Sequence, residues 1–187
     1  MSMRVSFEIS DKDISHFRDF MNKAREAVRD AEDEEIIEAA EGLFEEIRGA
    51  RAPQFVRQRL HRLEAMVNMV RDDEWAMPDS DRQRVLCALV YFCDPEDLIP
   101  DSIPGIGFLD DAIMIELVFR ELRHEIEAYD DFVEWRKAYD KRFRIKKSAE
   151  VRAERLESRR QQLLERVERR KQKDEDAGKT DSESHLF

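Results

Sequence analysis

The strongest constraint on the fold lies between Tyr91 and Ala112, where backbone-breaking residues are concentrated. Proline fixes φ and cannot continue a helix, so one helix must end before this segment and another must begin after it. The segment also carries six carboxylates and several apolar side chains, which a plain solvated linker would not need. We therefore interpret it as a stiff acidic loop and as the best candidate for a functional site. Its prolines and glycines are Pro95, Pro100, Pro104, Gly105 and Gly107.

Outside this loop, apolar residues recur at helical spacing. Charged residues and apolar residues each make up 41% of the chain, and only 5 glycines and 5 prolines occur, which favours long amphipathic helices over short strands. The pattern predicts an all-α bundle of about six helices with a long charged C-terminal helix. Expected boundaries are an N-cap at Ser10, an end at Gly49, a start at Pro53, a capping box of Ser80 and Gln83, and a stop near Asp94.

The first ten residues follow a different pattern. Val5, Phe7 and Ile9 alternate with polar residues, which is the two-residue period of a strand. We expect an extended segment that lies on the helices, and pairing with the same segment of a second copy stays open.

Charge divides the chain into three parts. Residues 1–140 have a formal balance of −16, residues 141–173 of +9 and residues 174–187 of −4. We predict an acidic helical domain, a basic helical arm and a disordered tail over these ranges. Ala149, Leu156 and Leu163 repeat at seven, which indicates a solvated helix or a marginal coiled coil.

Several observations favour a cytoplasmic protein. The first residues lack the apolar region of a signal peptide, and no apolar run approaches the roughly 20 residues of a membrane span. Cys87 and Cys93 have no metal-binding spacing, so we expect reduced structural thiols.

Five loop residues carry a resemblance to a known family: Tyr91, Pro95, Pro100, Pro104 and Gly107. With the neighbouring aspartates, this order resembles the signature of the YkvA-like family, a small bacterial helical domain of unassigned function. The resemblance covers roughly residues 82–120. It implies a helix–loop–helix unit with clustered aspartates, and it supplies no established activity.

The loop aspartates allow three interpretations. Carboxylates at helix starts and proline turns cap free N–H groups, so they can simply hold the loop in shape. They can pair with Arg82, Arg84 or Arg120 from neighbouring helices. The third is a site for Mg²⁺, Mn²⁺ or Ca²⁺, which prefer several oxygen ligands; otherwise we expect no cofactor. Its ligands would be Asp97, Asp101, Asp110 and Asp111.

The basic arm suggests an anionic partner, and RNA, DNA or the ribosome is one hypothesis. Interleaved glutamates favour a solvated helix instead, and the arm has no aromatic residue after Phe143 for base stacking. Folding back onto the acidic domain is a third option. The arm's cations are Arg159, Arg160, Arg166, Arg169, Arg170 and Lys171.

Catalytic motifs such as G-x-S-x-G, a P-loop or HExxH are missing from the sequence. We therefore favour a non-enzymatic interaction or scaffold module that binds a protein partner or a second copy. The alternatives are a divalent-metal-binding protein or metal-dependent hydrolase, and a nucleic-acid or ribosome-associated accessory protein. Trp75, between two expected helices, is interpreted as the cover of a loop or of a partner surface.

Overall fold

The computed structural model describes residues 11–49, 54–93, 109–143 and 148–178, and every regular element within these ranges is a helix. This confirms the predicted all-α bundle with a long charged C-terminal helix. The expected extended segment at Val5 to Ile9 lies outside the described residues. The seven described helices are α1 (Asp11–Asp30), α2 (Asp33–Gly49), α3 (Gln54–Arg71), α4 (Asp79–Phe92), α5 (Leu109–Glu121), α6 (Arg123–Phe143) and α7 (Ala149–Gly178).

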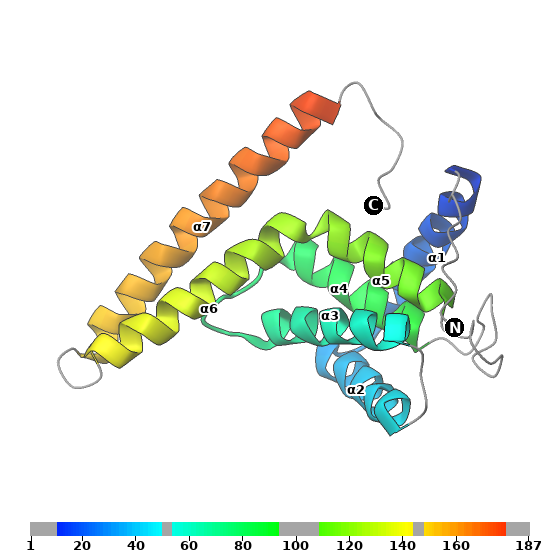
Figure 1. Ribbon diagram of the computed structural model, residues 1–187, viewed down its shortest axis with the longest axis horizontal. Coiled ribbons are helices and arrows are strands. Elements are labelled where there is room, and N and C mark those ends of the chain that lie inside the picture. The colour runs from blue at the N-terminus through cyan, green and yellow to red at the C-terminus, as the bar shows by residue number, and fades with distance from the viewer. Residues whose placement is uncertain (1–10, 50–53, 94–108, 144–147, 179–187) are drawn as a thin grey trace, which may run out of the picture.

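Helix α4 is the centre of the bundle, in contact with α1, α2, α3 and α5 (Figure 1). Its residues from Val85 to Leu89 are all buried, so the helix has no polar face in this stretch. A helix that is apolar all round is stable in water only when other helices cover every side. The hydrophobic composition of α4 thus requires the surrounding helices.

The prediction that a capping box of Ser80 and Gln83 opens α4 is wrong. Pro78 is the N-cap residue, the helix begins at Asp79, and no side chain caps it. Pro78 supplies its carbonyl to the amides of Asp81 and Arg82, and the carboxylates of Asp79 and Asp81 lie in the first turn, where the helix dipole favours them.

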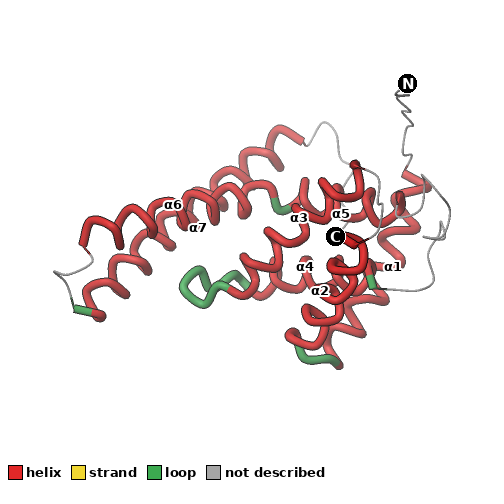
Figure 2. Tube along the Cα trace, turned by 60° about the horizontal axis from the view of Figure 1, so that its bottom comes forward, coloured by secondary structure: helices red, strands yellow, loops and turns green. Residues whose placement is uncertain are grey.

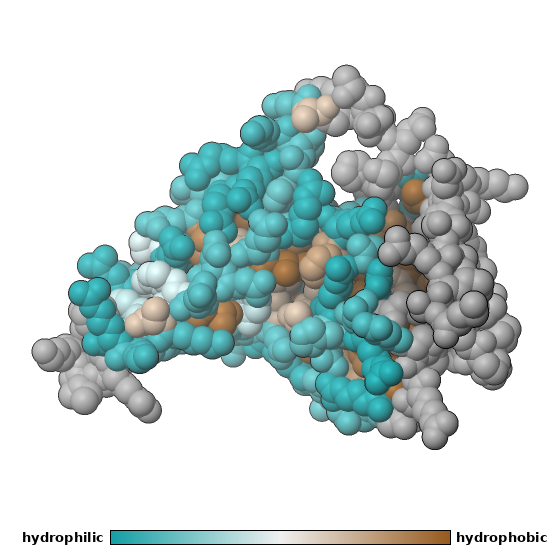
Figure 3. All heavy atoms as spheres, in the orientation of Figure 1, coloured by the Kyte–Doolittle hydropathy of each residue, from teal (hydrophilic) through white to brown (hydrophobic). Residues whose placement is uncertain are grey.

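Helices α6 and α7 form an antiparallel hairpin whose distal end extends beyond the bundle in two views (Figures 1 and 2). Leu156, Leu163 and Val167 of α7 are buried. Two members of the weak seven-residue repeat, Leu156 and Leu163, thus pack α7 within its own chain, while Ala149 is exposed. On the face shown in Figure 3, hydrophilic residues cover most of the hairpin, and hydrophobic residues show mainly in the seams between helices.

The predicted disordered tail begins too early. Helix α7 continues to Gly178, so residues 174–178 are helical, and residues 179–187 lie outside the described part. Asp174 is held by ion pairs with Arg123 and His124 at the start of α6. These contacts extend the helix past the last basic residues.

Gly42 in the middle of α2 offers a first prediction. A Cβ added there would meet nothing within 4 Å, so the fold does not require glycine. Gly42→Ala should raise the free energy of unfolding by about 0.5–1 kcal/mol, because alanine is the better helix former. Urea unfolding measures the change, with Ala39→Gly on the exposed face of the same helix as the inverse control. A loss of stability in Gly42→Ala would show that the glycine is needed.

Candidate functional site

The turn between α3 and α4, residues 72–78, is the point where the hairpin meets the bundle. Asp72 closes it, since its Oδ1 accepts hydrogen bonds from the amides of Glu74 (3.1 Å) and Trp75 (3.3 Å). Ala76 has φ of 44°, a left-handed conformation that costs a non-glycine residue about 1–2 kcal/mol. Arg160 of α7 donates to the carbonyls of Trp75 and Ala76. The turn is therefore held by Asp72 from within and by Arg160 from α7.

Trp75 lies inside the molecule, with 1% of its surface exposed. Its ring contacts Tyr129 and Phe132 of α6 at centroid distances of 5.7 and 5.4 Å. The interpretation of Trp75 as the cover of a partner surface is wrong. The side chain joins the turn to α6.

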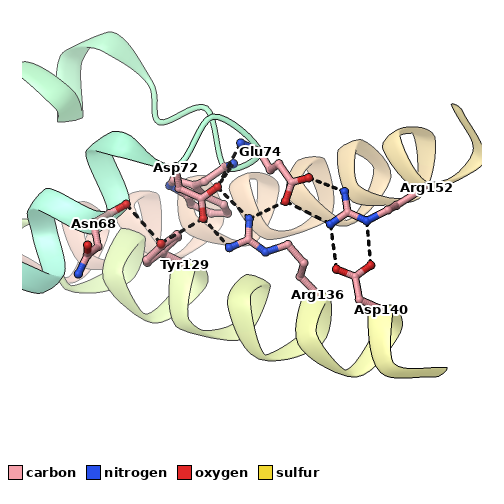
Figure 4. A network of polar contacts seen from close by, with 8 residues as sticks. Asn68, Asp72, Glu74, Tyr129, Arg136, Asp140 and Arg152 are labelled. Atoms are coloured by element: carbon pink, nitrogen blue, oxygen red, sulfur yellow. Dashed lines mark hydrogen bonds and ion pairs between the residues drawn. The ribbon is translucent and has the colours of Figure 1, made fainter. Parts of the chain in front are cut away.

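Two arginines clamp this turn to the hairpin (Figure 4). Arg136 of α6 holds Asp72 with two hydrogen bonds of 2.8 and 2.7 Å, and it reaches Glu74 at 2.8 Å. Arg152 of α7 holds Asp140 of α6 with two bonds of 2.8 and 2.9 Å and also pairs with Glu74. Glu74 is thus shared between α6 and α7. Bidentate pairs of this kind fix orientation as well as distance.

The clamp shifts the acidities of its members. Burial alone would raise the pKa of Asp72, but the hydrogen bond and charge of Arg136 outweigh it, and the pKa lies below its usual 3.8. Hydrogen bonds from Arg152 lower the pKa of Glu74 and of Asp140. Burial, followed by the nearby Asp72 charge, raises the pKa of Tyr129 to about 12, so it stays a hydrogen-bond donor. Its hydroxyl lies 3.1 Å from Asp72 Oδ2.

These shifts predict a loss of stability in acid. A carboxyl whose pKa is lower in the folded state stabilises the fold above its unfolded pKa, and this contribution disappears as pH falls through the folded value. The thermal unfolding midpoint should therefore drop below about pH 4. Asp72→Asn should have a lower midpoint at pH 7 and a shallower fall in acid. Circular dichroism from pH 7 to pH 3 measures both, and equal slopes for the two proteins would contradict the assignment to Asp72.

A second contact fixes the other end of α7. The ammonium group of Lys171 pairs with Glu125 of α6 and lies 3.6 Å from Asp81 of α4. Glu125 is 1% exposed and Asp81 is 4% exposed, and Arg84 lies 3.5 Å from Asp81. Burial lowers the pKa of Lys171, but Glu125 more than compensates, so the net pKa is raised. One cation thus connects three helices.

Removing this cation should be costly. Lys171→Met leaves the buried Glu125 without its cation, while Asp81 keeps Arg84, and we expect a loss of about 3 kcal/mol in the free energy of unfolding. Adding Glu125→Gln should restore part of the loss, because it removes one buried charge. Lys173→Met, at an exposed position of the same helix, is the control in urea unfolding. A loss no larger than that of the control would show that the buried pair contributes nothing.

The structure describes part of the predicted acidic loop. Asp110 and Asp111 lie in the first turn of α5 and are 2% and 3% exposed, which agrees with a capping position near the positive end of the dipole. Asp97 and Asp101 lie outside the described residues, as do Pro95, Pro100, Pro104 and Gly107. Among the described residues, no three His, Cys, Asp or Glu side chains gather as metal ligands do. The Mg²⁺, Mn²⁺ or Ca²⁺ site stays a prediction.

Tyr91 at the end of α4 is buried, and its ring contacts Phe17 and Phe20 of α1. Tyr91 therefore serves the packing of α1 on α4.

The arginines considered as partners of the loop also have other contacts. Arg82 pairs with Asp33, and Arg120 lies 3.3 Å from Glu116.

Cys87 and Cys93 are unpaired. Burial raises the pKa of each thiol to about 11. Both thiols stay protonated at neutral pH, which makes them poor nucleophiles.

The predicted basic arm is divided by its contacts. Four of its cations bind other parts of the chain. Arg166 reaches Asp131 and Arg170 reaches Glu127, both at 2.6 Å. Arg160 binds the α3–α4 turn and Lys171 binds Glu125, as described above. Arg159 and Arg169 have no ion pair within the part of the chain that the structure describes. The arm thus folds back onto the acidic helices, which was one of the three options.

Sequence reasoning missed the clamp. Asp72 and Arg136 are 64 residues apart, and Glu74 and Arg152 are 78 apart. Each is an ordinary charged residue in a chain that is 41% charged. The only local signal was the Asp72 turn with a tryptophan beside it.

Comparison with known proteins identifies the centre of this bundle. Residues 84–117, which span most of α4 and α5, match the model of a family described as a protein of unknown function (DUF1232). A 74-residue alignment is 35% identical to the uncharacterized membrane protein YkvA of Bacillus subtilis (strain 168), over 36% of this chain and 65% of that protein. The chain therefore spans less than two thirds of the relative's length. No solved structure matches the chain.

These matches confirm the predicted resemblance: the chain carries a YkvA-like segment, and α1 to α3, α6 and α7 surround it. In the described ranges, no helix combines the length and the apolar character that crossing a membrane requires.

Proposed function

We propose that this chain, in which a YkvA-like segment of unknown function forms the central helices, is a non-enzymatic interaction module. Its functional element is the α6–α7 hairpin, and the bundle serves to hold this hairpin at a fixed angle. The solvent-exposed surface of the hairpin, along α6 and α7, is the surface that meets a partner. We place the module in the cytoplasm.

The clamp at Glu74 carries this proposal. Arg136 and Arg152 come from the two arms of the hairpin, and both bind the same carboxylate on the turn before α4. The clamp therefore lies near the C-terminal end of α6 and the N-terminal end of α7, and this end of the hairpin extends past the bundle (Figures 1 and 2). A rigid projecting element loses little conformational entropy on binding.

The charged groups around the clamp support a structural role for it. The two arginines bind the carboxylates of Asp72, Glu74 and Asp140. These charges thus hold the α3–α4 turn, α6 and α7 together. A carboxyl group that transfers a proton near neutral pH works best with a raised pKa, and the pKa values of Asp72 and Glu74 are lowered.

Photo-crosslinking in cells can test the proposal. Benzoylphenylalanine would be placed at Ala138 or Ala153, two exposed positions of the hairpin next to the clamp, and at Ala39 or Gln58, two exposed positions on α2 and α3. We expect several-fold more adduct from the hairpin positions. The mass of the adduct separates a protein partner, a second copy and a nucleic acid.

Equal adduct from all four positions, or more from α2 and α3, would contradict the proposal. Arg136→Ala with Arg152→Ala provides a second control, since it should reduce the adduct at Ala138 by freeing the hairpin. A non-enzymatic role would also be contradicted by turnover of a substrate that is lost when Asp72, Glu74 or Asp140 is replaced by its amide.

A further inference from the structure

Several cations of α7 are not used by the fold. Arg155, Arg169 and Lys173 are exposed, and Arg159 is partly exposed. None of the four has an ion pair with another described residue, and Arg159 Nε is buried without a hydrogen-bond acceptor in the described part. In an acidic protein of net charge −11, four unpaired cations on one helix are unexpected.

Helix geometry places these cations in one row. From Arg155, the intervals to 159, 166, 169 and 173 are four, seven, three and four residues, which keeps the four unpaired cations, and the paired Arg166 between them, on one side of the helix. The row is about 27 Å long at 1.5 Å per residue. Among the nearby glutamates of α7, Glu154, Glu157 and Glu168 fall on a different side, and Glu165, four residues before Arg169, borders the row. The row itself is cationic along its length.

The hairpin register adds aromatic rings beside this row. Arg166 pairs with Asp131, and Arg152 pairs with Asp140, so residues 132–139 of α6 lie opposite residues 153–165 of α7. Trp135 follows Asp131 by four residues and therefore lies on the face of α6 that adjoins the cationic row. Its ring stacks on Tyr139 with centroids 5.1 Å apart, and both side chains are partly exposed.

The two carboxylates of α6 that face the row do not neutralise its unpaired cations. Asp131 and Glu127 of α6 are already paired with Arg166 and Arg170, both at 2.6 Å. Base stacking was not supported by the sequence of the arm, which lacks aromatic residues beyond Phe143. The fold changes this conclusion, because α6 supplies Trp135 and Tyr139 next to the arm.

We propose that this face of the hairpin binds single-stranded nucleic acid, with Arg155, Arg169 and Lys173 on the phosphates and Trp135 as the ring on which a base stacks. Single strands bind proteins through a row of cations that follows the backbone and through aromatic rings, with little sequence preference. An acidic peptide would use the cations but not the ring, and a lipid surface would take up the ring among its headgroups instead of stacking a base on it. The inference names the partner of the interaction module and rests on that proposed function.

The test uses the full chain and a fluorescein-labelled strand of about 12 thymidines. In the charge variant, Arg155, Arg169 and Lys173 are replaced by glutamine. The matched control replaces Lys23, Arg29 and Arg57 by glutamine, which removes the same charge from exposed positions of α1 and α3. We expect the charge variant to lose about tenfold or more in affinity at low salt, and the control less than twofold. The salt slope should fall by about 2 in the charge variant.

Fluorescence tests the stacking directly. Trp75 and Trp135 are the two tryptophans of the chain, and Trp75 is buried. Binding should quench the emission of Trp135, and Trp135→Leu should remove the quenching and weaken binding several-fold. The thermal unfolding midpoint of each variant, followed by circular dichroism, shows that it is folded.

Equal losses in the charge variant and the control would overturn the inference, because they would indicate unspecific attraction. So would binding without quenching, or equal binding to vesicles rich in phosphatidylglycerol or to polyglutamate. If no strand binds while photo-crosslinking still concentrates on Ala138 and Ala153, the inference is wrong and the interaction module stands. If crosslinking is also uniform, both are wrong.

Discussion

The arrangement of this protein depends on the ion pairs that join the α3–α4 turn to the two arms of the hairpin. Glu74 lies between Arg136 and Arg152, and Asp72 holds Arg136 by two hydrogen bonds. The apolar contact of α7 is modest, since Leu156, Leu163 and Val167 are its buried hydrophobic side chains in the described part. Exposed ion pairs contribute little, but bidentate and partly buried ones fix geometry. Here they determine where the hairpin points.

The distribution of charge then has a simple explanation. The acidic residues of α4, α6 and the turn receive the cations of one side of α7, with Lys171 on Glu125 as the most buried case. Breaking such a pair leaves an uncompensated charge in a poorly solvated place, which makes it a specific anchor. The cations on another side of α7 have no such role in the fold. One helix therefore serves both as a structural strap and as a free cationic surface.

Much of the bundle follows from the sequence. The apolar spacing predicts α1 to α6 and the long C-terminal helix, and the loop motif identifies the YkvA-like segment. The capping box at Ser80 is wrong because Pro78 already starts α4, and the tail is helical to Gly178 because Asp174 pairs with α6. Local patterns cannot reveal the pairing of Asp174 with α6 or the clamp, because these contacts join residues about 50 to 80 apart. The same reason hides the placement of Trp135 beside α7.

The central claim is that Arg136 and Arg152 hold the hairpin in one orientation. Double electron–electron resonance measures this orientation directly. Spin labels are attached to cysteines introduced at Ala138 and Arg57, in a background in which Cys87 and Cys93 are replaced. We predict one narrow distance distribution, which becomes broad when both arginines are replaced by alanine. A broad distribution in the unsubstituted clamp, or a narrow one that persists without the two arginines, would contradict the account.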